Sequence, residues 1–244
     1  MKPDLQQIWV YLAATPLLWL TLTLVAYQLA LWVYRRSGGH PLANPVLMSI
    51  AVLVPVLQLT GTRYETYFDG AQFAHFLLGP ATVALAIPLF AQWRRLRAMA
   101  LPLLVSLAVG SVFSVVVALG LAKLLGASTA TLMSLAPKSV TTPIGMGIAE
   151  KLGGIPSLTA VIVIVTGIVG AVFAAPLYRR LGIHDPAVQG FAIGLTAHGI
   201  GTARAFQMSE QTGAFSALAM GLNGLLTAVW VPWLVPLVLP LVLN

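Results

Sequence analysis

The sequence of 244 residues contains no cysteine and very few charged residues. The absence of cysteine excludes disulfides, thiolate metal sites and a cysteine nucleophile, but it leaves the cellular compartment open. Only 8% of the residues are charged, whereas about a quarter are charged in a typical soluble domain. The six acidic residues are too dispersed to predict a metal cluster. HExxH, GxSxG and Walker motifs are also absent, so we expect neither an enzyme nor a bound metal or cofactor.

Apolar residues dominate what is present. They make up 59% of the chain, and the mean hydropathy is +0.93. This composition predicts an integral membrane protein forming a single transmembrane domain over residues 1–244. A crossing needs ~20 apolar residues, so the length allows roughly six to nine membrane segments. We interpret the net charge of +7 as membrane-topology signals and not as a nucleic-acid-binding surface.

Apolar runs predict the membrane segments. We expect ordinary spans at 5–34, 42–61, 99–125, 155–178 and 214–243, and a span at 71–92 interrupted by Gly79-Pro80 and Pro88. A polar connection is expected at 63–69. Two further segments, 128–151 and 186–211, contain Gly, Pro, hydroxyl and charged residues at membrane depth. We predict that these two segments are broken helices.

The two broken segments resemble each other. Residues of the same type lie sixty positions apart in the two copies: Thr142 and Thr202, Glu150 and Glu210, Gly153 and Gly213, Leu158 and Leu218. An apolar helix follows each copy. The chain therefore divides into N-terminal spans over 1–125 and repeat units over 126–184 and 185–244. Duplicated, Gly/Pro-interrupted segments of this kind are typical of transporter binding sites.

Three arginine clusters predict the orientation, because positive charge in short loops faces the cytoplasm. Arg35-Arg36, Arg94-Arg95-Arg97 and Arg179-Arg180 share one side only if 128–151 enters the membrane and returns as a hairpin. By similarity, 186–211 forms a hairpin from the opposite side. We predict an all-α helix bundle with two broken-helix segments in an inverted repeat, as in elevator transporters, and both termini outside the cytoplasm.

Lys138 and Arg204 are cations within these broken segments. Because an unpaired charge at membrane depth is costly, each needs an anionic partner. We predict that a small carboxylate takes this role, contacted by Lys138, Ser139, Thr141, Thr142, His198, Gly201, Thr202 and Arg204. The alternative is structural: both cations reach the membrane surface or pair with Glu150 and Glu210.

Other residues have a functional and a structural interpretation. His198, Glu150 and Glu210 are candidates for coupling transport to H⁺ or Na⁺. His198 equally suits a backbone hydrogen bond, and the two glutamates suit hairpin ends. Gly79, Pro80, Thr82 and Asn223 are candidates for lining a cavity. The alternatives are a helix kink for the first three and an interhelical hydrogen bond for Asn223.

Several of these motifs resemble the LrgB/CidB family. They are Leu135-Ala136-Pro137-Lys138-Ser139-Val140-Thr141-Thr142-Pro143, Gly153-Gly154-Ile155-Pro156 and His198-Gly199-Ile200-Gly201-Thr202-Ala203-Arg204, with shorter signatures at Asn44-Pro45 and 79–89. The resemblance covers nearly the whole chain and implies a multi-pass protein of a bacterial inner membrane. It implies two competing functions. One is a carrier of small monocarboxylates such as glycolate, glycerate or pyruvate, and the other is a holin- or antiholin-like regulator of murein hydrolase export and cell lysis.

The residues favour the carrier, because a lesion-forming holin needs no duplicated polar hairpins in the membrane. The regulator would act with a small LrgA/CidA-like membrane protein. A third interpretation is a pure partner-binding subunit for that small protein, with its function in an interface. We also expect a homo-oligomer in the lipid bilayer.

Overall fold

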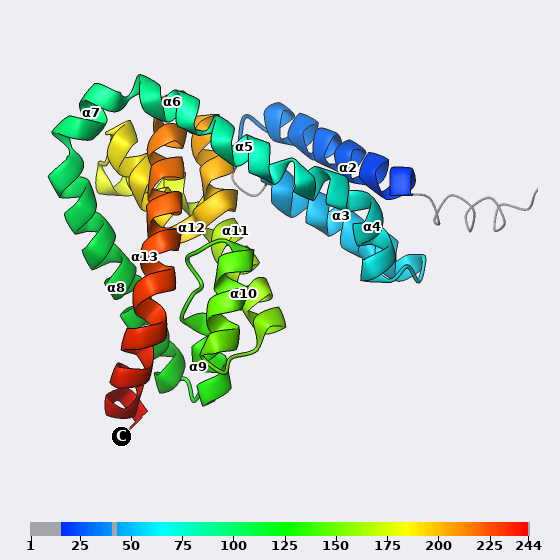
Figure 1. Cartoon of the computed structure of the whole chain (residues 1–244). Helices are drawn as coiled ribbons and strands as arrows, with labels where there is room; N and C mark the ends of the chain where they lie inside the picture. Colours follow the sequence, from blue (N-terminus) through cyan, green and yellow to red (C-terminus); the bar gives the residue numbers. More distant parts are fainter. Residues whose placement is uncertain (1–15, 41–42, 244) are drawn as a thin grey trace, which may run out of the picture. The chain divides into compact units, whose positions relative to one another are not determined.

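The computed structural model describes residues 16–40 and 43–243, and every regular element in these ranges is a helix. This confirms the predicted all-α class for the described residues. The helices, numbered α2 to α13 in Figure 1, group into two compact units, one up to Ala84 and one from Leu85. The single transmembrane domain over residues 1–244 stays a prediction.

Four helices are long and apolar enough to cross a membrane: Leu17–Arg36, Ala100–Leu124, Pro156–Leu181 and Glu210–Val235. A bent helix pair, Tyr64–Ala74 with Gly79–Ala91, brings the number to five if it forms one span. These helices agree with the runs predicted at 5–34, 71–92, 99–125, 155–178 and 214–243, whereas the run predicted at 42–61 forms only a shorter apolar helix of 15 residues, Pro45–Leu59. The start of the first predicted span, before residue 16, lies outside the described residues.

The first unit consists of α2 (Pro16–Arg36), α3 (Pro45–Leu59), α4 (Tyr64–Phe76) and α5 (Leu78–Ala84). Both α3 and α4 pack against α2. Trp19 of α2 is fully buried and meets the Tyr67 ring edge-on, with 6.0 Å between ring centroids. Asn44 caps α3, because its side-chain oxygen accepts hydrogen bonds from two backbone N–H groups at the helix start.

The polar connection predicted at 63–69 is wrong, because α4 begins at Tyr64. Aromatic side chains explain the helix: Tyr64 packs on Tyr67 and Phe68, three and four residues ahead on the same helical face. The run predicted at 71–92 is indeed interrupted. Regular helix stops at Leu77, just before Gly79-Pro80, and again at Leu85, before Pro88, although Leu85 keeps right-handed φ −63° and ψ −17°.

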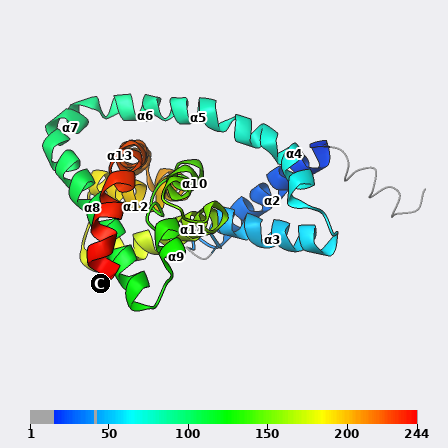
Figure 2. The ribbon, with the colours of Figure 1, turned by 60° about the horizontal axis from the view of Figure 1, so that its bottom comes forward.

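The second unit contains α6 (Ala86–Ala91), α7 (Trp93–Ala98), α8 (Ala100–Leu124), α9 (Thr129–Leu135), α10 (Thr142–Lys151), α11 (Pro156–Leu181), α12 (Pro186–Met208) and α13 (Glu210–Leu243). Two buried clusters align α8 with α13. Near the helix starts, Leu103 and Leu107 of α8 share a cluster with Phe215 and Ala219 of α13. Near the ends, Val115 of α8 shares a cluster with Val231 and Val235. The two helices are therefore parallel, as Figures 1 and 2 also show.

The chain reverses within 128–151. α9 and α10 are separated by turn and irregular residues at 136–141. Ser134, at the end of α9, accepts a hydrogen bond from the Ile155 N–H that follows α10, at 2.7 Å. Ala127 and Leu152, at the two ends of the segment, pack against the same cluster near the end of α8. The segment thus enters and leaves at the end of the bundle where α8 terminates.

The chain also reverses within 186–211. His198 interrupts α12 with φ 40° and ψ −133°, a conformation that non-glycine residues rarely adopt. A Cβ on Gly201 would lie 2.8 Å from Ile193 Cγ2, although eight residues span ~12 Å of a continuous helix. Ile183, just before the segment, and Met208, near its end, pack against one cluster. Ala187, at the start of the segment, shares a cluster with Leu103 and Phe215 near the starts of α8 and α13. This hairpin therefore opens at the end of the bundle where α8 and α13 begin.

The first half of α12 packs tightly against α13. Ideal Cβ atoms on Gly190 and Gly194 would lie 2.1 Å and 2.0 Å from the carbonyl oxygens of Thr212 and Ser216. Only glycine fits at these two positions, because any side chain would push the backbones apart. The contact fixes the second hairpin on α13.

Candidate functional site

Asn223 of α13 joins the two interrupted backbones. It is buried, and its side-chain amide donates to the Ser139 carbonyl oxygen at 3.2 Å and to the Leu195 carbonyl oxygen at 3.0 Å. Ser139 belongs to the first break, and Leu195 lies just before the second. The two breaks therefore meet at one side chain. Asn223 makes the interhelical hydrogen bonds of the structural interpretation, and it is not among the residues lining the cavity described below.

We expect Asn223→Leu to lower the stability of the folded protein. Leucine keeps the size of the side chain but removes both donors, each worth ~0.6–1.7 kcal/mol inside a membrane protein. Thermal unfolding of the purified protein in detergent measures the loss. Thr227→Val is the matched control, because Thr227 lies one turn away and its hydroxyl contacts the Asn223 side-chain oxygen at 3.3 Å and Ser111 Oγ at 3.4 Å, but neither interrupted backbone. An Asn223→Leu midpoint equal to that of the wild type would show that the bridge contributes nothing.

Lys138 lies at the tip of the first hairpin, surrounded by hydroxyl groups. Its ammonium group donates to Ser114 Oγ of α8 and to Ser139 Oγ, both at 3.0 Å. The two hydroxyls are also 3.0 Å apart, so the three groups form a triangle. Among the described residues, no carboxylate forms an ion pair with Lys138. Its positive charge is solvated by dipoles alone, which leaves it able to attract an anion.

A cavity of about 620 Å³ extends from Lys138 along α8 and the first half of α12. Its polar lining residues are Ser106, Ser114, Lys138 and Thr196, and the other lining residues are apolar or glycine. Ser114 lies near the middle of α8. The arrangement is that of a small-molecule site, in which a few polar groups orient a ligand within apolar walls.

His198 is held by the backbone of α11. Its ring is buried, and Nε2 donates to the Val163 carbonyl oxygen at 2.9 Å. Gly167 makes room for the ring, since a Cβ there would lie 2.7 Å from His198 Cε1. This contact is the backbone hydrogen bond of the structural interpretation. Coupling to H⁺ or Na⁺ through His198 stays a prediction.

Thr202 closes the second hairpin. Its hydroxyl donates to the His198 carbonyl oxygen at 2.8 Å and lies 2.9 Å from Ser216 Oγ of α13. Gly201 packs on Ala197 and Ile193. These contacts stabilise the hairpin itself. In the first hairpin, Thr141 and Thr142 are half-buried at the start of α10.

Arg204 is buried in the returning half of α12, where Nη1 donates to Gln207 Oε1 at 3.2 Å. It does not line the cavity that Lys138 lines.

Glu150 and Glu210 are exposed, at the end of α10 and the start of α13. Both therefore lie at hairpin bases, as expected. Gly79 and Pro80 are exposed at the start of α5, which also contains Thr82 and belongs to the first unit. That these three residues line a cavity stays a prediction.

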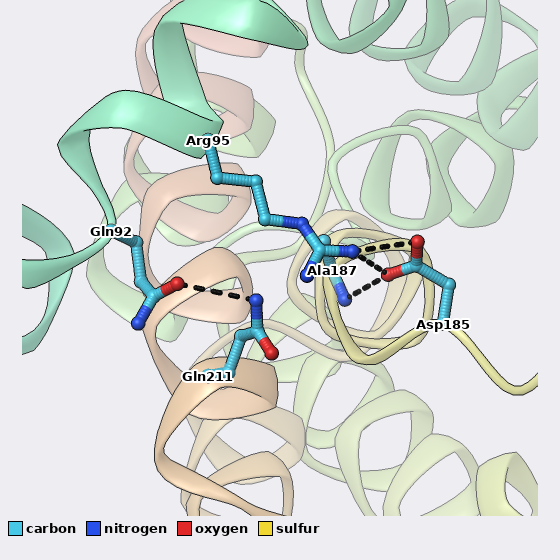
Figure 3. A network of polar contacts seen from close by, with 5 residues as sticks. All are labelled: Gln92, Arg95, Asp185, Ala187 and Gln211. Atoms are coloured by element: carbon cyan, nitrogen blue, oxygen red, sulfur yellow. Dashed lines mark hydrogen bonds and ion pairs between the residues drawn. The ribbon is translucent and has the colours of Figure 1, made fainter.

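A polar network at the start of α12 was not predicted from the sequence. Figure 3 shows Arg95 of α7 donating to both carboxylate oxygens of Asp185 at 2.7 Å, and Gln211 donating to Gln92 at 3.2 Å. Asp185 also caps α12 by accepting the Ala187 N–H. An aspartate before a proline is a readable helix-start signal. Its arginine partner, 90 residues earlier, has no local signal.

The helices, the interrupted hairpins and the cavity define a polytopic integral membrane protein. The chain matches the model of the LrgB-like family over residues 23–237, and it belongs to this family. This confirms the resemblance seen in the motifs.

One relative is the uncharacterized protein YwbG of Bacillus subtilis (strain 168), to which the chain is 38% identical over 215 residues. The alignment covers 88% of this chain and 95% of the relative. The chain is 31% identical over 224 residues to the antiholin-like protein LrgB of Bacillus mycoides (strain KBAB4), covering 92% and 97%. It is 30% identical to the antiholin-like protein LrgB of Bacillus cereus (strain B4264) over the same length. No solved structure matches the chain.

Proposed function

We propose that this protein carries a small monocarboxylate across the membrane and binds it at Lys138. The single observation that supports this proposal is an ammonium group at a helix break that lines a cavity and, among the described residues, is hydrogen-bonded only to the hydroxyls of Ser114 and Ser139. A carboxylate at Lys138 would gain a charge-assisted hydrogen bond. One cation in the cavity lining suits a ligand with one negative charge.

The two hairpins suggest how access alternates. They open at opposite ends of the bundle and meet at Asn223. We propose that they are the two halves of an inverted repeat and that the membrane midplane lies near Lys138. Interrupted backbone is tolerated at that depth only where it is buried or lines a cavity. Movement of the hairpins relative to α8 would open the site to one side at a time.

The second candidate is an antiholin-like regulator acting with a small LrgA/CidA-like membrane protein. It is favoured by the names of the relatives, two of which, at 30–31% identity, are called antiholin-like protein LrgB. The comparisons support this role better than the carrier. Location in a bacterial inner membrane and assembly into a homo-oligomer belong to both proposals.

Uptake into proteoliposomes separates the two candidates. Purified protein is reconstituted alone and with an LrgA-like protein, and uptake of labelled pyruvate and glycolate is measured against protein-free liposomes. The carrier predicts saturable uptake by the protein alone or by the pair. The regulator predicts no saturable uptake in either case, together with a change in the rate of cell lysis when the gene is deleted. Absence of uptake with both preparations would reject the carrier.

A further inference from the structure

The cavity at Lys138 is long and mostly apolar. Its lining residues on α8 run from Pro102 to Leu121, which corresponds to about 29 Å of helix at 1.5 Å per residue. The facing wall is the first half of α12, including Phe191 and Leu195. Apart from Lys138, the polar side chains that line it in the described part of the chain are three hydroxyls, those of Ser106, Ser114 and Thr196. A pyruvate-sized ligand at Lys138 would leave most of this apolar wall without contact.

The volume decides what kind of molecule fits. About 620 Å³ falls within the range of small-molecule sites, ~300–1,000 Å³. A partner helix ~10 Å wide and ~29 Å long would need roughly 2,300 Å³. The cavity is therefore too small to seat a helix, but it is large enough for a narrow chain-like molecule.

The charge distribution places the anionic end of such a molecule. Lys138 contacts Ser114, and the cavity continues along α8 in both directions from this point, past Gly110 on one side and Val117 on the other. Neither Arg95 nor Arg204 lines the cavity. A ligand with one charged end and an apolar chain matches this combination, whereas a dicarboxylate would place its second charge against apolar side chains.

We propose that the cavity binds a monocarboxylate with an apolar chain of medium length, with the carboxylate at Lys138 and the chain along α8. This inference rests on the proposed carboxylate site at Lys138 and extends it to the substrate class. The apolar wall then contributes to affinity in proportion to the chain length that it buries.

Equilibrium dialysis of the purified full-length protein in detergent tests the inference. The probes are labelled acetate, butyrate, hexanoate and octanoate, with octanol as the uncharged comparison, and protein-free detergent corrects for partitioning. We expect affinity to rise about two- to fourfold for each added methylene. Octanol should bind at least about tenfold more weakly than octanoate, because it lacks the charge-assisted hydrogen bond to Lys138.

Variants of neighbouring valines locate the chain. Both Val116 and Val117 are exposed on α8, but only Val117 of the two lines the cavity. Val117→Trp fills the cavity and should reduce octanoate binding at least about tenfold while leaving acetate binding largely unchanged. Val116→Trp is the matched control and should bind both acids as the wild type does. Lys138→Met should abolish the difference between octanoate and octanol.

The outcomes distinguish this inference from the proposed function. Equal affinity for acetate and octanoate, with dependence on Lys138, would overturn the inference and leave the carboxylate site intact. Binding of every acid unchanged by Lys138→Met would reject both. Loss of octanoate binding in nanodiscs with phosphatidylglycerol, but not in nanodiscs with phosphatidylcholine alone, would identify an anionic lipid as the occupant and overturn the inference.

Discussion

Lys138→Met should raise the KM for monocarboxylate uptake roughly ten- to hundredfold while the protein remains folded and inserted in the membrane. Methionine keeps the length and apolar stem of lysine but removes the charge that attracts the carboxylate. Loss of a charge-assisted hydrogen bond of this kind costs ~1.5–3 kcal/mol, which corresponds to roughly ten- to hundredfold weaker binding. We would measure initial uptake rates in proteoliposomes over a range of pyruvate concentrations, which gives the change in KM.

Lys151→Met is the matched control for this experiment. Lys151 lies on the same hairpin, at the exposed end of α10, so its replacement should leave uptake unchanged. Because the hydrogen bonds of the Lys138 ammonium group to described residues go to the hydroxyls of Ser114 and Ser139, its replacement breaks no ion pair among these residues. Thermal unfolding of both variants checks that the protein is folded. Normal uptake by a folded Lys138→Met protein would contradict the carboxylate site and favour the regulatory role.

Gly194→Ala should destabilise the second hairpin strongly. The added Cβ would lie 2.0 Å from the Ser216 carbonyl oxygen of α13, well inside van der Waals contact distance. Because this oxygen belongs to the helix backbone, it cannot move away as a flexible side chain would. Overpacking of a close contact typically costs ~1–3 kcal/mol. Thermal unfolding in detergent and the yield of monodisperse protein measure the effect. Both should fall.

Gly221→Ala is the control on the partner helix. No atom lies within contact distance of a Cβ at Gly221, so alanine only reduces the backbone entropy of the unfolded chain. Replacement of glycine within a helix then stabilises by up to ~1 kcal/mol. The two substitutions are chemically identical and should act in opposite directions. A Gly194→Ala protein as stable as the wild type would show that α12 and α13 are not in close backbone contact.

The helix breaks were predictable because their cause is local. Pro137 and Pro143 flank the first break, and prolines of this kind disfavour a continuous helix whatever surrounds them. His198 marks the second break within a glycine-rich stretch. The same reasoning failed at residues 63–69, where polar residues suggested a connection between spans and the structure has the start of α4. In that segment, the Tyr64 ring packs on the rings of Tyr67 and Phe68 along one face of the helix.

The partners of the candidate site residues were not predictable. The sequence predicts both Lys138 and Arg204 to be cations within the membrane, yet of the two only Lys138 lines the cavity. Ser114, which lies 24 residues before Lys138 and binds its ammonium group, was indistinguishable in the sequence from other serines within apolar runs. Its role depends on the rotation of α8 about its own axis, which packing against α12 and α13 sets.

The sequence by itself determined the helical class, the membrane-spanning runs, the two interruptions and the family. Each of these depends on composition or on neighbouring residues, because hydropathy and backbone preference act over a few positions. Only the tertiary structure decided that Asn223 bridges Ser139 and Leu195 and that Arg95 meets Asp185. Hydrogen-bond partners far apart in the chain are chosen by how helices pack, and that packing depends on the shape of all contacting side chains at once.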